Sequence, residues 1–325
     1  MSVIHRTLEP VTVSPRLADP LIREALDGLR ATPKTLPCKL LYDDAGSKLF
    51  DEICDLPEYY PTRTELDITE QYADQLARFV GDHAHLIELG SGSSTKTPLL
   101  LDRLPTLSSY TPIDISENHL ADAARRIQHR YPQLYVDPVV ADYCDDWSIP
   151  ESPKPPARRV AYFPGSTIGN FDPDHARAFL DDLAHKLGPD GRLVIGVDLK
   201  KSPDVLIPAY DDAQGTTAAF NFNLLVRLNR EADADFDLDA FTHEARWNET
   251  LGRIEMHLVS RRDHVVRVAG QKIHFRRGET IHTESSHKHT LEGFAELASA
   301  FEIHEVLTDD AGLFSVQCLS VRESA

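Results

Sequence analysis

The chain has 325 residues and a formal net charge of −18, from 34 Lys and Arg against 52 Asp and Glu. Because cationic side chains supply most of the affinity for nucleic-acid phosphates and anionic membrane surfaces, this charge argues against both as partners. The composition is 41% hydrophobic, and no apolar run approaches the roughly 18 residues of a membrane helix, so we expect a globular protein of about two domains.

The first residues, MSVIHRTLEPVTVSPRL, are interrupted by charges and prolines and do not look like a secretory signal. The four cysteines are far apart and include no Cys-x-x-Cys pair: Cys38, Cys54, Cys144 and Cys318. Isolated thiols are typical of a reducing compartment, so we expect a cytoplasmic protein.

From about residue 64, short apolar runs alternate with amphipathic stretches. The predicted strands are residues 85–89, 110–113, 134–140, 159–163 and 192–197. The clearest predicted helices are 117–129, led by Ser116, and 172–187, with Asp172 at the N-cap, Pro173 in the first turn and Gly188 just past the end. Strands that alternate with helices indicate a doubly wound α/β sheet, whose ligands bind at the carboxyl ends of the strands.

Two other regions depart from this alternation. The segment FEIHEVLTDDAGLFSVQCLSVR predicts an antiparallel hairpin that closes one edge of the sheet. Residues 201–288 contain a helical passage and then strand-like pieces at 253–259, 264–268 and 272–275. We therefore expect one domain from residues 62–200 plus 289–325, and a discontinuous second domain from residues 1–61 plus 201–288 that covers the strand ends.

The segment HLIELGSGSSTKT predicts a strand, a Gly90-Ser91-Gly92 turn and a helix start. Glycines allow the backbone to approach a ligand, and a helix start offers free N–H groups. Because Thr95 replaces the third glycine of a dinucleotide fingerprint, a pyrophosphate is not favoured. A tight turn without a ligand is the alternative.

Two carboxylates follow the next two predicted strands. Asp114 suits a pair of ribose hydroxyls, and Asp142 can accept from an adenine amino group while Tyr143 packs on the base. Each alone could be a surface residue, but three consecutive strand ends of this kind describe an adenosyl site without phosphates. S-adenosylmethionine is the ligand that fits, and the loop FPGSTIGN with Asn170 would face its reactive end.

Other signals do not predict a metal. His282, His287 and His289 have no suitably spaced carboxylate to complete a familiar ligand set. The alternating acids at 233–239 resemble a calcium loop, but Leu238 occupies the glycine position. Neither a Gly-x-Ser-x-Gly elbow nor a Gly-x-x-x-x-Gly-Lys-Ser/Thr loop occurs, so hydrolase and nucleotide-triphosphatase functions have no support.

Motifs spread over about residues 30–320 resemble the histidine Nα-methyltransferases of ergothioneine biosynthesis. They are KLLYDDAGSKLFDEICDLPEYYPTRTE (39–65), IELGSGSSTKT (87–97), FPGSTIGN (163–170), AYDDAQGTTAAFN (209–221), ADFDLDAF (234–241), RIEMHL (253–258) and TESSHK (283–288). The resemblance implies a Rossmann-like class I methyltransferase that trimethylates the α-amino group of L-histidine to hercynine with S-adenosylmethionine, without nucleic-acid or membrane partners and as a monomer.

The resemblance also implies residue roles. The cofactor contacts would be Gly90, Gly92, Lys96, Asp114, Asp142 and Tyr143. The substrate contacts would be Tyr59, Asn170, Tyr210, Met256, Glu284, Ser285 and Ser286. Tyr42 and Tyr59 would act nearest the reacting amine, and their ring faces could hold a quaternary ammonium.

The chemistry of these residues is consistent with the implied reaction. Asn170 and Tyr210 can each donate a hydrogen bond to the substrate carboxylate. If residues 283–286 are extended, Glu284 and Ser286 share a face while Ser285 points away, and an anionic acceptor beside a hydroxyl suits the two imidazole nitrogens. The group that accepts the amine proton stays open. The alternatives are a family member acting on another amino acid such as tryptophan, and a noncatalytic S-adenosylmethionine-binding protein.

Overall fold

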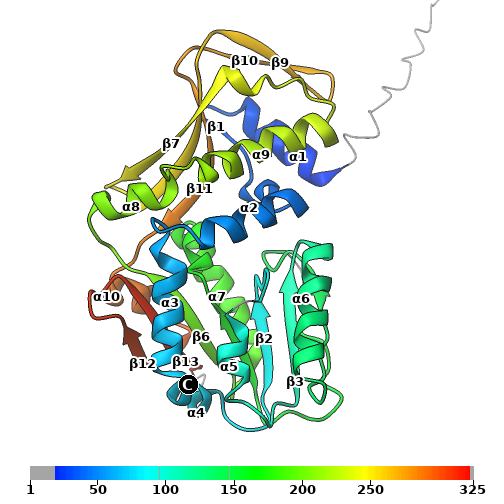
Figure 1. Cartoon of the computed structure of the whole chain (residues 1–325), viewed down its shortest axis with the longest axis vertical. Helices are drawn as coiled ribbons and strands as arrows, with labels where there is room; N and C mark the ends of the chain where they lie inside the picture. Colours follow the sequence, from blue (N-terminus) through cyan, green and yellow to red (C-terminus); the bar gives the residue numbers. More distant parts are fainter. Residues whose placement is uncertain (1–18, 95, 146, 323–325) are drawn as a thin grey trace, which may run out of the picture.

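The computed structural model describes residues 19–94, 96–145 and 147–322. Figure 1 shows two regions, one above the other, each built on its own β-sheet. In this part of the chain, no helix has the length and apolar character needed to cross a membrane.

The lower sheet has seven strands in the order β12-β13-β6-β5-β2-β3-β4. All neighbours pair in parallel except β13, which is antiparallel to both β6 and β12. The strands are β2 (His85–Leu89), β3 (Ser109–Asp114), β4 (Val139–Val140), β5 (Arg159–Phe163), β6 (Arg192–Asp198), β12 (Phe301–Thr308) and β13 (Phe314–Val321). The predicted doubly wound sheet and its C-terminal hairpin are confirmed.

Helices cover both faces of this sheet, because its inner strands are apolar on both sides. In β2, Leu86 packs into the core under α3 and α4, whereas Ile87 and Leu89 face α7 on the opposite side. The helices of this region are α3 (Tyr60–Gln71), α4 (Ala73–Val80), α5 (Thr97–Leu101), α6 (Glu117–Arg130), α7 (Pro173–Leu187) and α10 (Leu291–Leu297).

The predicted signals at the two ends of α7 act as expected, whereas Ser116 precedes α6 without a capping hydrogen bond from its side chain. The Asp172 side chain accepts from the backbone N–H of His175, and Gly188 ends α7 with a φ of 81°. The predicted strand at 134–140 is wrong in length, because the ladder with β3 covers only Val139–Val140 and an isolated bridge at Val136 precedes it. Pro138 lacks the N–H that a continuous ladder would need.

The upper sheet has the order β1-β11-β8-β7 and packs against α1, α2, α8 and α9 (Figure 1). Its strands are β1 (Lys34–Thr35), β7 (Phe241–Asn248), β8 (Arg253–Ser260) and β11 (Thr280–His287), with a separate hairpin of β9 (His264–Val268) and β10 (Gln271–Phe275). Its helices are α1 (Pro20–Arg30), α2 (Asp44–Cys54), α8 (Pro203–Tyr210) and α9 (Thr216–Glu231). Strand β7 was not predicted.

The upper region thus joins the N-terminal residues to the 201–288 insertion. We propose that it is the predicted domain of residues 1–61 plus 201–288, of which residues 1–18 lie outside the described part of the chain; the distribution of the strands between the two sheets supports this. The regions touch where the short helix η3 (Thr167–Asn170) meets β11. A Cβ on Gly169 would lie 2.7 Å from the His287 carbonyl oxygen, so this close contact requires glycine.

Candidate functional site

The glycine turn after β2 and the carboxylate after β3 form one structure. Gly90 and Gly92 have φ values of 65° and 48°, which favour glycine. The N–H groups of Gly92 and Ser116 donate to the two oxygens of Asp114, at 2.8 and 2.9 Å. Asp114 therefore ties together the ends of two adjacent strands.

The segment after β4 supplies the other predicted cofactor contacts. The Asp142 carboxylate accepts from the N–H of Cys144 at 2.9 Å, and Lys39 lies 3.8 Å from its other oxygen. The Tyr143 ring packs edge-on against Phe163, with centroids 5.7 Å apart. The ring therefore has a fixed orientation beside the glycine turn.

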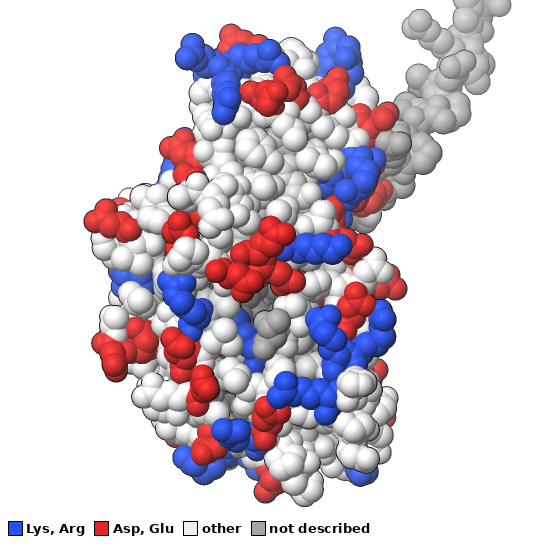
Figure 2. Space-filling view, in the orientation of Figure 1, with Lys and Arg blue, Asp and Glu red and all other residues white. Residues whose placement is uncertain are grey.

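Gly90, Gly92, Asp114, Asp142 and Tyr143 line one large cavity. Four of its lining residues are acidic: Glu24, Asp51, Asp114 and Asp142. Figure 2 shows acidic side chains gathered on this face of the molecule where the two regions meet. The surroundings are thus suited to a cationic ligand.

Lys96, however, does not line this cavity. Its Nζ is bonded to the buried Glu65, whose carboxylate also accepts from the N–H of Gly165 at 2.9 Å. Lys96 and Gly165 therefore share the Glu65 carboxylate, and the cofactor contact of Lys96 stays a prediction. Glu65 lies on α3, far away in the sequence, and its pairing was not predicted.

A second, smaller cavity lies beside the first, toward the upper sheet. Four residues line both cavities: Tyr42, Phe50, Thr167 and Asn170. The predicted substrate residues on its wall are Tyr42, Tyr59, Asn170, Tyr210, Met256, Glu284 and Ser286. The two cavities therefore meet at the four residues that line both.

The alternation predicted for residues 283–286 is present in β11, with one irregularity. The pairing with β8 shifts between His282 and Glu284, which places Glu284 directly opposite Met256. Thr283 is the extra residue of this bulge, and its hydroxyl donates to the Met256 carbonyl at 3.0 Å. Glu284 and Met256 consequently face the cavity together.

Ser285 has a different environment. Its hydroxyl lies 3.1 Å from Nε2 of His282, on the opposite side of the strand from Glu284 and Ser286. The structure therefore does not bring Ser285 to the cavity, because neighbouring side chains of a strand point to opposite faces.

Glu284 is surrounded by few polar partners. The Tyr42 hydroxyl lies 3.4 Å from its Oε1, and the Asn170 amide nitrogen 3.5 Å from the same oxygen. Burial raises the pKa of Glu284 to about 7, against the opposing effects of the Tyr42 hydrogen bond and the Lys288 charge. A hydrogen-bond donor on a bound ligand would stabilise the ionised form of the Glu284 side chain.

Aromatic rings line the second cavity, and two of them, Tyr42 and Phe50, also line the first. Tyr42 contacts Phe50 and Phe220 edge-on, with centroids 5.8 and 5.5 Å apart, and Tyr59 lies 6.1 Å from Tyr210. Burial raises the pKa of Tyr42 well above 10, so its hydroxyl stays protonated and can donate. The wall offers electron-rich ring faces near the junction.

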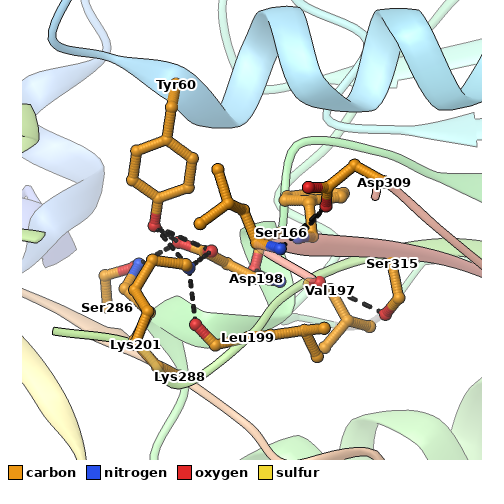
Figure 3. Close-up of polar contacts among 12 residues, drawn as sticks. Tyr60, Ser166, Val197, Asp198, Leu199, Lys201, Ser286, Lys288, Asp309 and Ser315 are labelled. Atoms are coloured by element: carbon orange, nitrogen blue, oxygen red, sulfur yellow. Dashed lines mark hydrogen bonds and ion pairs between the residues drawn. The ribbon is translucent and has the colours of Figure 1, made fainter. Parts of the chain in front are cut away.

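A group of buried charges beneath Ser286 was missed from the sequence (Figure 3). Asp198, at the end of β6, pairs with Lys288 at 2.7 Å and with Lys201, and the Tyr60 hydroxyl donates to it at 2.7 Å. Burial alone would raise the pKa of Asp198, but Lys288 and Lys201 lower it, so the carboxylate is ionised.

Two signals could have found this group. Asp198 directly follows the apolar run of its strand, as Asp114 does. Lys288 continues the two-residue alternation of Glu284 and Ser286, so an extended chain would place it on the same face. Neither signal predicts that both charges are fully buried.

The comparisons with known proteins agree along most of the chain. A family model described as "Histidine-specific methyltransferase, SAM-dependent" matches residues 21–321. The histidine N-alpha-methyltransferase of Mycolicibacterium smegmatis is 44% identical over 94% of this chain and 96% of that protein. The protein of the same name from Mycobacterium tuberculosis is 42% identical over 91% of this chain and 93% of its own length.

A more distant relative is longer than this chain. Ergothioneine biosynthesis protein 1 of Neurospora crassa is 34% identical over 203 residues, which cover 61% of this chain and 23% of that protein. The similarity to it therefore concerns a minor part of a larger protein.

Proposed function

Because the chain belongs to the histidine-specific, S-adenosylmethionine-dependent methyltransferase family, we propose that it methylates the α-amino nitrogen of L-histidine three times to give hercynine. One observation carries this proposal: the cavity beside the glycine turn shares four lining residues with a second cavity, whose wall presents an acceptor, Glu284, and a hydroxyl, Ser286, from one strand face.

The residues of the first cavity fit S-adenosylmethionine. Asp114 would accept from the ribose hydroxyls, Asp142 from the adenine amino group, and the Tyr143 ring would pack on the base. The bound cofactor supplies the methyl carbon of its sulfonium, and the acidic lining of the cavity favours that positive charge.

The second cavity would hold the amino acid at its two ends. Glu284 and Ser286 would bind the imidazole nitrogens, with Met256 against the ring. Asn170 would donate to the carboxylate from the junction, which leaves the amine near Tyr42 and facing the first cavity. Tyr210, predicted to share the carboxylate, has its hydroxyl bonded to Ser286 and Lys288 instead.

Methyl transfer from a sulfonium is an in-line displacement, so the protein must mainly align a neutral amine with the methyl carbon and exclude water. Covalent nucleophiles have no role in this step. The product carries a quaternary ammonium without an N–H donor, and the faces of Tyr42 and Tyr59 would stabilise it by cation–π attraction of roughly 0.5–2 kcal/mol.

Mass spectrometry tests the proposal directly. Purified protein would be incubated with S-adenosylmethionine and each of the twenty amino acids. We expect a product 42 mass units heavier than histidine, about three methylene increments from repeated methylation of one aligned amine. A heavier tryptophan product would support the alternative substrate, and cofactor binding without S-adenosylhomocysteine formation would indicate a noncatalytic protein.

We also propose that the protein is a monomer in the cytoplasm. The four cysteines are free thiols, which supports a reducing compartment. Light scattering on protein eluted from a size-exclusion column tests the oligomeric state, since a dimer would have twice the monomer mass of 36.4 kDa. Fractionation of the cells tests the location.

A further inference from the structure

Lys288 lies beneath the ring end of the second cavity, and its side chain is 0% exposed. An ammonium group has three N–H donors and no acceptor. The Lys288 Nζ lies 2.7 Å from Asp198 Oδ2, 2.8 Å from the Tyr210 hydroxyl and 2.8 Å from Ser286 Oγ. Three acceptors thus use all three donors of Lys288.

This arrangement determines the direction of the hydrogen bonds around Ser286. Both hydroxyl oxygens accept from Lys288, so neither can donate back to it. The Tyr210 hydroxyl lies 2.9 Å from Ser286 Oγ and donates to it, because a phenol is a stronger acid and a better donor than an alcohol. Ser286 Oγ therefore accepts two hydrogen bonds and has both lone pairs occupied.

The remaining O–H of Ser286 is its only free hydrogen-bonding group. It has no acceptor among the residues that the structure describes, and Ser286 lines the cavity. Glu284, two residues earlier on the same face, is an acceptor when ionised. The wall therefore presents one acceptor and one donor.

We propose that Lys288 is a positioning residue that makes Ser286 an obligate donor, so that the site binds only a neutral imidazole, with its N–H at Glu284 and its unprotonated nitrogen at Ser286. This inference rests on the proposed function. An imidazolium has two N–H donors, and one of them would face the Ser286 O–H. Two donors cannot form a hydrogen bond with each other, so the charged ring would be rejected. An indole lacks the second ring nitrogen, so it would leave that O–H without an acceptor.

Several titratable groups surround Lys288. They are Asp198 on β6, Lys201 after it, Tyr60 on α3, Tyr210 on α8, and Glu284, His287 and His289 on its own segment. Titration of these groups changes the protein in the same way for two substrates of the same shape. The ratio of the kcat/KM values of two such substrates therefore reports the protonation of the substrate ring.

The experiment compares L-histidine with L-1,2,4-triazole-3-alanine. The triazole has a donor and acceptors in a ring of the same size, and it stays neutral where imidazole is protonated. The neutral fraction of an imidazole with a pKa of about 6.5 falls about tenfold between pH 7.5 and pH 5.5. For the unmodified protein, we expect the ratio of kcat/KM for histidine to that for the triazole to fall by about this factor.

The variant Lys288→Met frees a lone pair on Ser286, so imidazolium would be tolerated and the ratio should fall by less than about threefold over the same range. Tyr210→Phe also frees a lone pair and should flatten the ratio in the same way, which provides a second test if Lys288→Met does not fold. Lys201→Met is the matched control, because it removes a lysine from Asp198 without touching Ser286, and it should keep the tenfold fall.

The outcomes separate the two proposals. Suppose that the protein methylates histidine and that the folded Lys288→Met and Tyr210→Phe variants keep the tenfold fall in the kcat/KM ratio. Lys288 then does not make the Ser286 hydroxyl an obligate donor, so this inference is wrong while the proposed function stands. If Tyr210→Phe instead raises KM equally for both substrates, Tyr210 binds the carboxylate and the inference is also wrong. If no variant or parent protein methylates histidine, both proposals fail.

Discussion

Replacing Glu284 by Gln tests whether this carboxylate binds the substrate ring. Gln keeps the shape and an acceptor oxygen but removes the charge. A hydrogen bond to a charged group contributes about 1.5–3 kcal/mol and a neutral one about 0.5–1.5 kcal/mol. The midpoints of these ranges differ by about 1.3 kcal/mol, which corresponds to a loss of roughly tenfold in kcat/KM for histidine. S-adenosylmethionine affinity should not change, because Glu284 lines only the second cavity.

The pH dependence makes this prediction sharper. Burial raises the pKa of Glu284 to about 7, so the unmodified carboxyl is mostly neutral at pH 6 and mostly ionised at pH 8. The advantage of the unmodified protein over Glu284→Gln should therefore grow from about twofold at pH 6 to about ninefold at pH 8. Ionisation of the substrate cancels in this comparison, since both proteins receive the same histidine.

The assay is steady-state methyl transfer from pH 5.5 to pH 8.5, with cofactor binding measured by calorimetry at each end. Ser285→Ala is the matched control, because Ser285 lies next to Glu284 but faces His282 on the other side of the strand. It should leave the KM for histidine unchanged. A Glu284→Gln variant with unchanged kcat/KM, or with a loss that does not vary with pH, would refute the role of Glu284.

Three further predictions concern the cofactor site, the contact between the regions and the buried charges. Tyr143→Ala should weaken S-adenosylmethionine binding by about 1–3 kcal/mol, the usual loss for a ring stacked on a base. Tyr143→Phe should keep the dissociation constant within about twofold of the parent value in calorimetry. Equal losses in the two variants would contradict stacking. Gly169→Ala should destabilise the fold by about 1–3 kcal/mol in urea denaturation, because its Cβ would lie 2.7 Å from the His287 carbonyl oxygen. An unchanged free energy of unfolding would mean that this contact is not tight. Asp198→Asn should cost about 3–5 kcal/mol, since it leaves Lys288 buried without its counter-ion. Because the folded pKa of Asp198 is lowered, its contribution is complete above the unfolded value of about 3.9 and is lost as the pH falls from there through the folded pKa, so the stabilities of parent and variant should approach each other below about pH 4.

Much of the fold could be predicted from local sequence patterns. The limits of α7 follow from Asp172, Pro173 and Gly188, because capping and backbone preferences act between residues close in the chain. The positions of Asp114 and Asp142 after their strands were sufficient to predict one shared cavity, since parallel strands end at a common edge. The resemblance to a known family then supplied the substrate side of the site.

The contacts that the sequence did not predict arise where distant segments meet. Lys96 is hydrogen-bonded to Glu65 on another helix and does not line the first cavity. Ser285 is separated from Glu284 and Ser286 by the pleat of β11, and the bulge at Thr283 sets which side faces Met256. Strand β4 is short because Pro138 interrupts its ladder, a local signal that the apolar run outweighed in the prediction.

The sequence by itself determined the order of strands and helices, the glycine turn and the carboxylates at the strand ends, because these depend on neighbours within a few residues. Only the tertiary structure decided which side chains share a hydrogen bond across the two regions. Asp198 and Lys288 are 90 positions apart, yet they meet at 2.7 Å beneath Ser286. A buried charge is tolerated only when a partner is brought to it by the packing of the whole chain, and no local pattern specifies that partner.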